Sequence, residues 1–571
     1  CDLLIIDDLG TELHGSFVTA ALYSLVNDRD DAWCERAFAP ALDMEQQMRQ
    51  RNIPLWGLES GDPLKDFDFV GFTLQFELNY SNILQMLELS GIPFYAKDRD
   101  EQYPLIVAGG PCAFNSEPVA DFFDLIMIGD GEEHMMQMLD LYAACKKHGY
   151  SKKEFLERAS AIRGIYVPSL YDVSYTKDNC VTISPEKKVE RYVISDLNHC
   201  FMPEKPLVPT IQVIHDRVAL ELFRGCVRGC RFCQAGMIYR PARFRSLERL
   251  TDNAKKQCAN TGYDEMSLLS LSSSDHPQIY DLINSLTEWT CPSHIRLSLP
   301  SLRIDNMPKE LMAKISENKK NGLTFAPEAG SQRLRDVINK NITEEDIVRT
   351  CRIAFEQGYT SVKLYFMLGL PTETDEDILA IGELAQKVVN LYYSLPTRQK
   401  GKSVSVSISL STFVPKPFTP FQWEPQLGSD EIERRQKLLR NSITTKKIAV
   451  RWNDPKISML EAVFARGDRR LAKVIETAYH YGARFDGWDE FLQFDAWEKA
   501  FAECGIDPIT YGKRAIDLDA TLPWDMIDAG ISKAFFQNEN RKAHAEITTP
   551  DCLSGCSGCG IAKYKGGICR G

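Results

Sequence analysis

The stretch Arg224-Gly-Cys-Val-Arg-Gly-Cys-Arg-Phe-Cys-Gln-Ala-Gly236 carries three cysteines, Cys226, Cys230 and Cys233, with the spacing C-x3-C-x2-C. Three thiolates can hold three corners of a 4Fe-4S cube and leave the fourth iron without a protein ligand. Because electron-carrier clusters ordinarily use four thiolates, this stretch predicts a cluster whose open iron binds another molecule. A structural zinc site needs four protein ligands, and no fourth Cys or His lies close in sequence to supply one.

Apolar runs before and after the cysteines predict a series of parallel strands. Each run is separated from the next by enough residues for a helix, so residues 216–425 predict six βα units. In barrels built from such units, functional residues lie at the carboxyl ends of the strands. The predicted strands are Val218–Phe223, Glu265–Leu271, Ile295–Leu299, Leu323–Phe325, Ser361–Met367 and Val404–Leu410.

With Phe232 before its third cysteine, the motif resembles that of the radical S-adenosylmethionine (SAM) enzymes, and six βα units match their partial TIM-like barrel. The resemblance implies that Cys226, Cys230 and Cys233 bind a 4Fe-4S cluster whose open iron is chelated by SAM. One electron from the cluster then releases a 5'-deoxyadenosyl radical, while the protein orients the reactants and excludes water. A reductant such as flavodoxin or ferredoxin is the expected partner.

The resemblance also assigns SAM contacts to the strand ends. Ser272 lies in Ser270–Asp275, after the second strand, where family members bind the SAM amino group. Glu328 ends the fourth strand, where a carboxylate could meet the ribose or methionine part of SAM. Taken singly, each such residue is more often a solvated loop or capping group. The full set comprises Phe232, on the adenine side, Ser272, Ser298, Arg303, Glu328 and Lys363.

Residues 1–150 predict an N-terminal doubly wound α/β domain, followed by a connector over residues 151–215. Short apolar runs of the buried parallel type indicate its strands: Leu3–Ile6, Phe69–Leu74, Leu105–Ala108 and Leu125–Ile128. An α/β domain before such a barrel resembles the cobalamin-binding architecture. Thr73, Gly109 and Gly110 fall where the cobalamin nucleotide tail would thread. The D-x-H-x-x-G motif that supplies a lower axial histidine is absent, because His14 follows Glu12 rather than Asp. The domain binds cobalamin without that ligand, or binds none.

Residues 1–28 depart from this pattern. The run Leu3-Leu-Ile-Ile-Asp-Asp-Leu-Gly10 resembles a Walker B strand, and the extension to Asn27 looks like a helicase-loader ATPase. A Walker B strand needs the phosphate loop G-x-x-x-x-G-K-[ST]. That loop is absent, since Gly401-Lys402-Ser403 is preceded by Pro396 at the position of the first glycine. A buried first strand with an acidic end is therefore the favoured interpretation.

A second set of cysteines lies in residues 549–571, after a region, 426–548, that is predicted to be mostly helical. Cys552, Cys556 and Cys559 repeat the C-x3-C-x2-C spacing, and Cys569 follows. Only 12 residues come after Cys559, so no barrel can follow it. Four thiolates would close an accessory site for zinc or for a second iron–sulfur cluster. A thiol-rich tail without metal is the remaining alternative.

The composition argues against some classes of protein. The chain has 571 residues, 17 cysteines and a net charge of -12, which argues against a generally basic nucleic-acid surface. No apolar run approaches a membrane span and no secretory signal is visible, so a cytoplasmic protein without a membrane partner is expected. Reduced thiols and metal ligands fit that compartment.

Three functional hypotheses follow from the sequence. The first is a transferase that modifies an unactivated carbon, with cobalamin-dependent methyl transfer as one option. The second is sulfur insertion into RNA, because Val414–Trp423 resembles the barrel-closing segment of radical SAM RNA methylthiotransferases. Residues 430–548 show no clear basic, aromatic-rich stripe for RNA. The third is a non-catalytic iron–sulfur or zinc scaffold. The substrate, RNA or protein, stays open.

Overall fold

A computed structural model of the chain describes residues 2–6, 13–176, 181–209, 216–299, 322–398, 401–564 and 566–569. The chain divides into two units. The first comprises Cys1–Val208, Leu460–Gly512 and Ile516–Gly530, and the second comprises Pro209–Met459, Lys513–Ala515 and Ile531–Gly571. Arg303, one of the residues expected to contact SAM, lies outside the described residues.

The first unit is built on a sheet with strand order β2-β1-β3-β4-β5-β6, in which β1 to β5 are parallel and β6 is antiparallel. This order reverses between β1 and β3, as in doubly wound folds, so the predicted N-terminal fold is confirmed. The sequence did not suggest β2, because the charged residues Glu35 and Arg36 interrupt its apolar residues. The strands are β1 Asp2–Ile6, β2 Trp33–Ala37, β3 Phe69–Thr73, β4 Leu105–Gly109, β5 Leu125–Met127 and β6 Ile165–Tyr166.

Helices cover both faces of this sheet. Phe69 packs in one apolar core with side chains of α1, α4 and α5. Phe72 lies three residues further along β3, and successive side chains of a strand point to opposite faces. It borders a cavity with Ile83 and Met86 of α3, so α3 covers the other face. These helices are α1 Leu13–Asn27, α2 Leu42–Arg51, α3 Tyr80–Leu89, α4 Gly131–His148 and α5 Lys152–Ala159.

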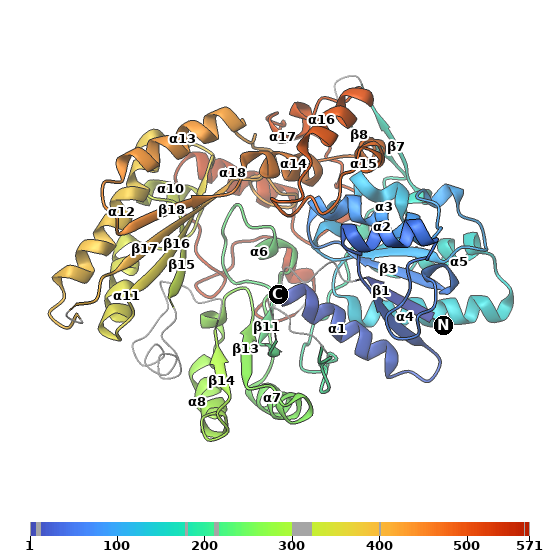
Figure 1. The fold of residues 1–571 in the computed structure, drawn as a ribbon, viewed down its shortest axis with the longest axis horizontal. Helices are drawn as coiled ribbons and strands as arrows, with labels where there is room; N and C mark the ends of the chain where they lie inside the picture. Colours follow the sequence, from blue (N-terminus) through green and yellow to red (C-terminus); the bar gives the residue numbers. More distant parts are fainter. Residues whose placement is uncertain are drawn as a thin grey trace. The chain divides into compact units, whose positions relative to one another are not determined.

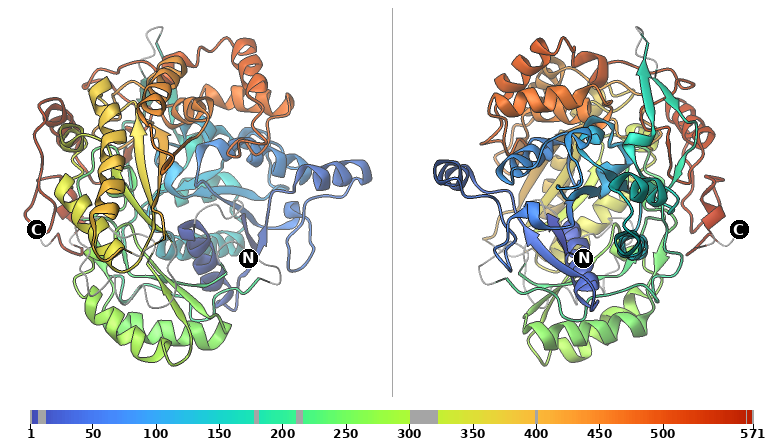
Figure 2. Two further views of the ribbon diagram at one scale, coloured as in Figure 1. Left: turned by 60° about the vertical axis from the view of Figure 1, so that its left-hand side comes forward. Right: turned by 90° about the vertical axis from the view of Figure 1, so that its right-hand side faces the viewer.

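Part of the predicted helical region also belongs to the first unit. Helix α15 packs on α3 and on the 3-10 helix η5 (Glu117–Phe122), and Figure 2 shows these orange helices against the blue N-terminal layer. The amide of Asn115 donates to the carbonyl of Ala465 at 2.9 Å. The buried carboxylate of Glu117 pairs with Arg469 at 3.1 Å. The helices are α14 Pro455–Ala465, α15 Leu471–His480, α16 Phe494–Glu503 and α17 Ile509–Gly512.

Short strand pairs complete the first unit. The antiparallel hairpin and the parallel pair both involve the connector predicted at residues 151–215. Their strands are β7 Asp172–Tyr175, β8 Val181–Ser184, β9 Val189–Glu190 and β19 Ile527–Asp528.

The second unit contains all six predicted barrel strands. Within the described residues they form two parallel sheets, β10-β13-β14 and β15-β16-β17-β18. Strand β18 is a seventh parallel strand, beyond the six that were predicted. The strands are β10 Val218–Glu221, β13 Glu265–Leu269, β14 Arg296–Ser298, β15 Leu323–Glu328, β16 Ser361–Leu368, β17 Ser405–Thr412 and β18 Ile448–Trp452, with the antiparallel pair β11 Phe223–Arg224 and β12 Arg243–Phe244 beside them.

Helices pack on one face of each of these sheets. Figure 1 shows α11, α12 and α13 along one side of β15–β18, and the green helices α7 and α8 lie along β13 and β14 in Figure 2. Capping boxes fix two helix starts, at Thr343 for α11 and at Thr374 for α12. The helices are α6 Ala235–Ile238, α7 Leu247–Thr261, α8 Ile279–Thr290, α10 Gln332–Val337, α11 Glu344–Glu356, α12 Asp375–Ser394, α13 Ser429–Ser442 and α18 Lys533–His544.

Among the described helices, none is both long and apolar enough to cross a membrane.

Gly129 sets how closely the connector approaches the first sheet. Its φ is +114°, and a Cβ there would lie 2.1 Å from the carbonyl oxygen of Tyr192. We expect Gly129→Ala to lower the free energy of unfolding by on the order of 3 kcal/mol, since backbone must move. Gly149→Ala is the matched control, with φ +70° and no atom near its Cβ, and should cost about 1 kcal/mol. Equal losses in urea unfolding of the two variants would contradict this assignment.

Candidate active site around the cysteine loop

The cysteine loop, residues 225–234, lies between β11 and α6, directly after the first barrel strand as predicted. Cys226, Cys230 and Cys233 are half-buried. The backbone N–H of Arg228 donates to the sulfur of Cys226 at 3.4 Å, and that of Gly236 donates to the sulfur of Cys233 at 3.3 Å. Such bonds favour thiolates and tune the iron–sulfur clusters that they bind.

Burial, followed by the charges of Cys230 and Cys226, raises the pKa of Cys233 to about 12. The thiol of Cys233 is therefore mostly protonated at neutral pH unless a bound cation stabilises its thiolate. Three soft sulfur donors with N–H groups facing two of them fit a 4Fe-4S cluster. Among the described residues, no three Cys, His, Asp or Glu side chains already converge tightly enough to hold a metal ion. Binding therefore requires the thiols to turn toward a common centre.

Arg231 anchors the loop from its middle, and its side chain is fully buried. Its guanidinium donates to Glu539 at 3.1 Å, to the carbonyl of Val337 at 2.9 Å and to the carbonyl of Ile547 at 2.6 Å. Its backbone N–H donates to the carbonyl of Ile338 at 3.0 Å. One side chain thus ties the loop to the end of α10, to α18 and to the segment after α18.

Three consecutive carbonyls of the loop are also bonded from outside it. The carbonyl of Val227 accepts from the N–H of Cys552 at 2.9 Å. The carbonyl of Arg228 accepts from Arg240 at 2.8 Å, and that of Gly229 accepts from the Asn339 amide at 3.0 Å. These bonds fix the main chain of residues 227–229, and within the loop the N–H of Arg228 faces the sulfur of Cys226.

Phe232 and Glu328, both expected at the SAM site, lie in one neighbourhood. The ring of Phe232 packs against the apolar core that contains Leu334, Leu370 and Phe413. The ammonium of Lys340 lies 6.0 Å from the centre of that ring and donates to Glu328 at 3.0 Å. Glu328 ends β15 with φ +69°. A carboxylate, a cation and an aromatic face are therefore grouped beside the cysteines.

Ser272 is also brought to the cysteine loop. Its hydroxyl is buried and donates to Asp275 at 2.6 Å. Asp275 in turn accepts from the guanidinium of Arg228 at 2.9 Å. The polar segment after β13 is therefore connected to the loop through an ion pair.

Two other predicted contacts lie apart from this group. Ser298 is the half-buried last residue of β14 and pairs in register with Ser267. Lys363 is the third residue of β16 and donates to the hydroxyl of Tyr365 at 2.7 Å. The carboxyl end of β16, Leu368, is five residues further on, or about 16 Å along the strand. Both assignments remain predictions.

Several site residues were not singled out from the sequence. Arg228, Arg231 and Lys340 each contact the loop or its aromatic residue, and Asn339 adopts φ +53° to reach it. The available signal was the placement of two arginines between ligand cysteines. No signal in the sequence pointed to Lys340, because only the fold brings it next to Phe232.

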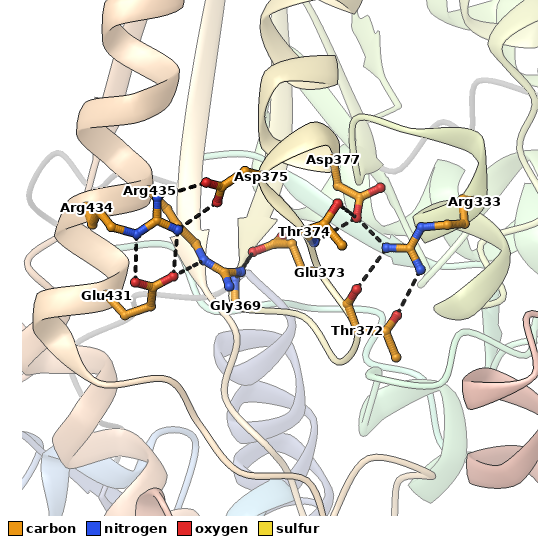
Figure 3. A network of polar contacts seen from close by, with 10 residues as sticks. All are labelled: Arg333, Gly369, Thr372, Glu373, Thr374, Asp375, Asp377, Glu431, Arg434 and Arg435. Carbon is orange, nitrogen blue, oxygen red and sulfur yellow. Dashed lines mark hydrogen bonds and ion pairs between the residues drawn. The ribbon is translucent and has the colours of Figure 1, made fainter.

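The turn after β16 is held by a network of ion pairs, shown in Figure 3. Glu373 accepts from the N–H of Gly369 at 2.7 Å and pairs with Arg435. Asp377 pairs with Arg333, which also donates to the carbonyl of Thr372 at 2.8 Å. The network fixes the rim of the second sheet, which borders the core of Phe232.

The cysteines of the tail, residues 549–571, belong to the same unit as the loop. Cys559 is buried, Cys556 is exposed, and Cys552 and Cys569 are half-buried. Burial, then the charges of Cys552, Cys559 and Cys556, raises the pKa of Cys569 to about 11. The four thiols are therefore within electrostatic reach of one another.

Thr73 and Gly109, expected to contact cobalamin, end neighbouring strands and pair in register. A Cβ on Gly110 would lie 2.8 Å from the carbonyl oxygen of Leu74, whose N–H donates to Gly109 at 2.7 Å. A cavity bordered by Thr73 measures about 20 Å³, the room of one water molecule. Gly110 therefore packs directly on the main chain of Leu74, and the assignment of Thr73, Gly109 and Gly110 to cobalamin remains a prediction.

Comparison with known proteins places the chain in a family. The profile described as "Radical SAM superfamily" matches residues 220–385, and that described as "Radical SAM proteins, N-terminal" matches residues 19–168. The uncharacterized protein MJ0966 of Methanocaldococcus jannaschii is 32% identical over 437 residues, which cover 75% of this chain and 84% of that protein. The chain belongs to the radical SAM superfamily, whose enzymes use a 4Fe-4S cluster and SAM.

More distant similarities add the fold. A putative methylthiotransferase of the same organism, MJ0865, is 23% identical over 222 residues, which cover 36% of this chain and 48% of that protein. The structure of the cobalamin-dependent SAM radical enzyme OxsB, with aqua-cobalamin and SAM bound, has a TM-score of 0.50 at 12% identity and covers 99% of this chain and 83% of that chain. This likeness confirms an α/β domain followed by a partial barrel.

Glu373 should make stability depend on pH. Burial raises its pKa to about 7 from 4.5, so its contribution to stability is fully present below pH 4.5 and is lost as pH rises to 7. We expect the free energy of unfolding of Glu373→Gln to rise relative to the unsubstituted protein across pH 4.5 to 7 and to stay level above pH 7. Glu431→Gln is the control, because hydrogen bonds from Arg434 and Arg435 hold the pKa of Glu431 at about 2. A parallel trend in the two variants during urea unfolding would contradict the assignment.

Proposed function

We propose that this chain cleaves SAM reductively to a 5'-deoxyadenosyl radical and uses that radical to modify an unactivated carbon of its substrate. The cysteine loop supports this proposal most. Its three thiols lie on one short backbone segment, which is hydrogen-bonded to α10, to α18 and to the tail. When bound, a 4Fe-4S cluster supplies the electron that breaks the sulfonium carbon–sulfur bond. The protein's part is to place SAM and keep water out.

The residues beside the loop suit SAM, which carries an amino group, a carboxylate, a ribose and an adenine. Phe232 offers an apolar face to the adenine. Glu328 can accept from the ribose hydroxyls or the amino group, and Lys340 can donate to the carboxylate. Lys340 already pairs with Glu328. When SAM binds, this ion pair would be replaced by two, one from SAM to each residue, so no charge would be buried unpaired.

Enzymes of this superfamily need a reductant. We propose flavodoxin or ferredoxin for that role and a cytoplasmic location. The described cysteines are all free thiols, which is consistent with a reducing compartment.

Replacing Cys230 by Ala should abolish SAM cleavage, since two thiolates cannot hold the cluster. The measurement is 5'-deoxyadenosine release after anaerobic reconstitution and reduction with dithionite. Cys291→Ala is the matched control, because Cys291 is an exposed thiol in the same unit, and it should keep full activity. If the reconstituted unsubstituted protein releases no 5'-deoxyadenosine, a non-catalytic scaffold becomes the better hypothesis.

Cobalamin-dependent methyl transfer is the finer proposal for the reaction. It is supported by the whole-chain fold likeness to OxsB and by the pairing of Thr73 with Gly109 at neighbouring strand ends. Protein made with the vitamin supplied should then show cobalamin absorption after gel filtration, and Gly110→Val should lose it. Protein without the cobalamin absorption bands would remove methyl transfer through cobalamin from consideration.

Sulfur insertion into RNA is the second candidate, supported by the 23% identity to a putative methylthiotransferase and by the segment Val414–Trp423. The two candidates differ in the mass that the substrate gains. Comparing RNA nucleosides and protein peptides from cells with and without the intact gene identifies which polymer gains a methyl or a methylthio group.

A further inference from the structure

The tail is fastened to the cysteine loop at its start. The N–H of Cys552 donates to the carbonyl of Val227, within the loop, at 2.9 Å. The carboxylate of Asp551 pairs with Arg228 at 2.9 Å. Arg228 also pairs with Asp275, so one guanidinium joins the tail, the loop and the segment after β13.

The tail is also fastened beyond its third cysteine. The carbonyl of Cys559 accepts from the N–H of Ser532 at 3.0 Å. Near the end, the N–H of Ile568 donates to the carbonyl of Ala242 at 3.2 Å. Ala242 precedes β12, the strand that pairs with β11 at the entrance to the loop. The tail is therefore bonded to the loop at Val227, to Ser532 at the start of α18 and to Ala242 before β12.

Little apolar burial accounts for this order. Across residues 551–564 the described elements are turns and one 3-10 helix, η8, whose residues Ile561 and Tyr564 are buried together with Cys559. Fixing a backbone costs roughly 1–2 kcal/mol per residue, more than three buried side chains return. Short cysteine-rich segments commonly meet this cost by binding metal.

The tail cysteines lie next to these three hydrogen bonds, which we call the anchors. A metal bound to all four cysteines would therefore link the anchors to one another. Cys552 lies at the first anchor, Cys559 at the second and Cys569 directly after the third. Cys556 lies between the first two and accepts from the N–H of Gly558 at 3.4 Å. The sulfurs have not converged on one point, which is equally true of the cysteine loop.

We propose that Cys552, Cys556, Cys559 and Cys569 bind one tetrathiolate metal centre, either zinc or a second iron–sulfur cluster, that locks the tail onto the cysteine loop. Four protein ligands leave no open position, so this centre binds no SAM. The centre itself is independent of the proposed function. Only its effect on the loop rests on the loop holding the first cluster.

The first experiment isolates the tail in the full-length protein. In a variant with Cys226, Cys230 and Cys233 all changed to Ala, metal analysis should find about one Zn, or about two or four Fe, per chain. X-ray absorption should show four sulfur ligands, at about 2.3 Å for zinc. Adding Cys556→Ser should remove this metal, whereas adding Cys291→Ser should not. A folded triple variant that holds neither metal in stoichiometric amount would overturn the proposal, whether or not the unsubstituted protein cleaves SAM.

The second experiment measures the lock. With the three loop cysteines intact, Cys556→Ser should still assemble the first cluster but release its iron to a chelator several-fold faster. The Cys291→Ser control should match the unsubstituted protein, since both cysteines are exposed and only one lies in the tail. An unchanged release rate in a Cys556→Ser protein shown to lack the tail metal would overturn the locking role.

Discussion

The buried guanidinium of Arg231 is the constraint on which the cysteine loop depends. A buried charge is tolerated only when it is paired and fully hydrogen-bonded. Its partners, Val337, Glu539 and Ile547, lie more than 100 residues further along the chain. The loop is therefore placed by the finished unit rather than by its own sequence. Arg231 lies between two of the cysteines that are expected to bind the cluster. A change in the packing around Arg231 would therefore also displace their sulfur atoms.

A second constraint is the difference between the two faces of the barrel strands. Along β17, Val406, Ile408 and Leu410 are buried, whereas every other residue from Ser405 to Ser411 is a serine. Parallel strands covered on both faces ordinarily read as continuous apolar runs, and bulky residues fill the interior of a closed TIM barrel. On the other face of β17 the side chains are small hydroxyl groups, which fill less volume than the bulky residues of a closed barrel.

The sequence predicted what local patterns determine. The three-cysteine loop, the six barrel strands and the doubly wound domain were all predicted, because thiol spacing and runs of apolar residues are local signals. Strand β2 was missed because the charged residues Glu35 and Arg36 interrupt the apolar residues of Trp33–Ala37. The assignment of residues 460–512 to the N-terminal unit was also missed. It rests on contacts such as Asn115 to Ala465, which join residues 350 positions apart and leave no mark in a local pattern.

The positions of Glu328 and Lys363 show why a residue type on the correct strand does not suffice. Both belong to neighbouring parallel strands, and the register pairs Lys363 with Thr324 rather than with Glu328. After a register shift Glu328 pairs with Phe366, so at about 3.3 Å per residue it lies about 10 Å along the sheet from Lys363. Glu328 is the last residue of its strand and reaches Lys340 beside Phe232, whereas Lys363 is held by Tyr365 lower in the sheet. The point where a strand ends therefore decides which charged side chain lies beside Phe232, and that point is set by pairing across the sheet.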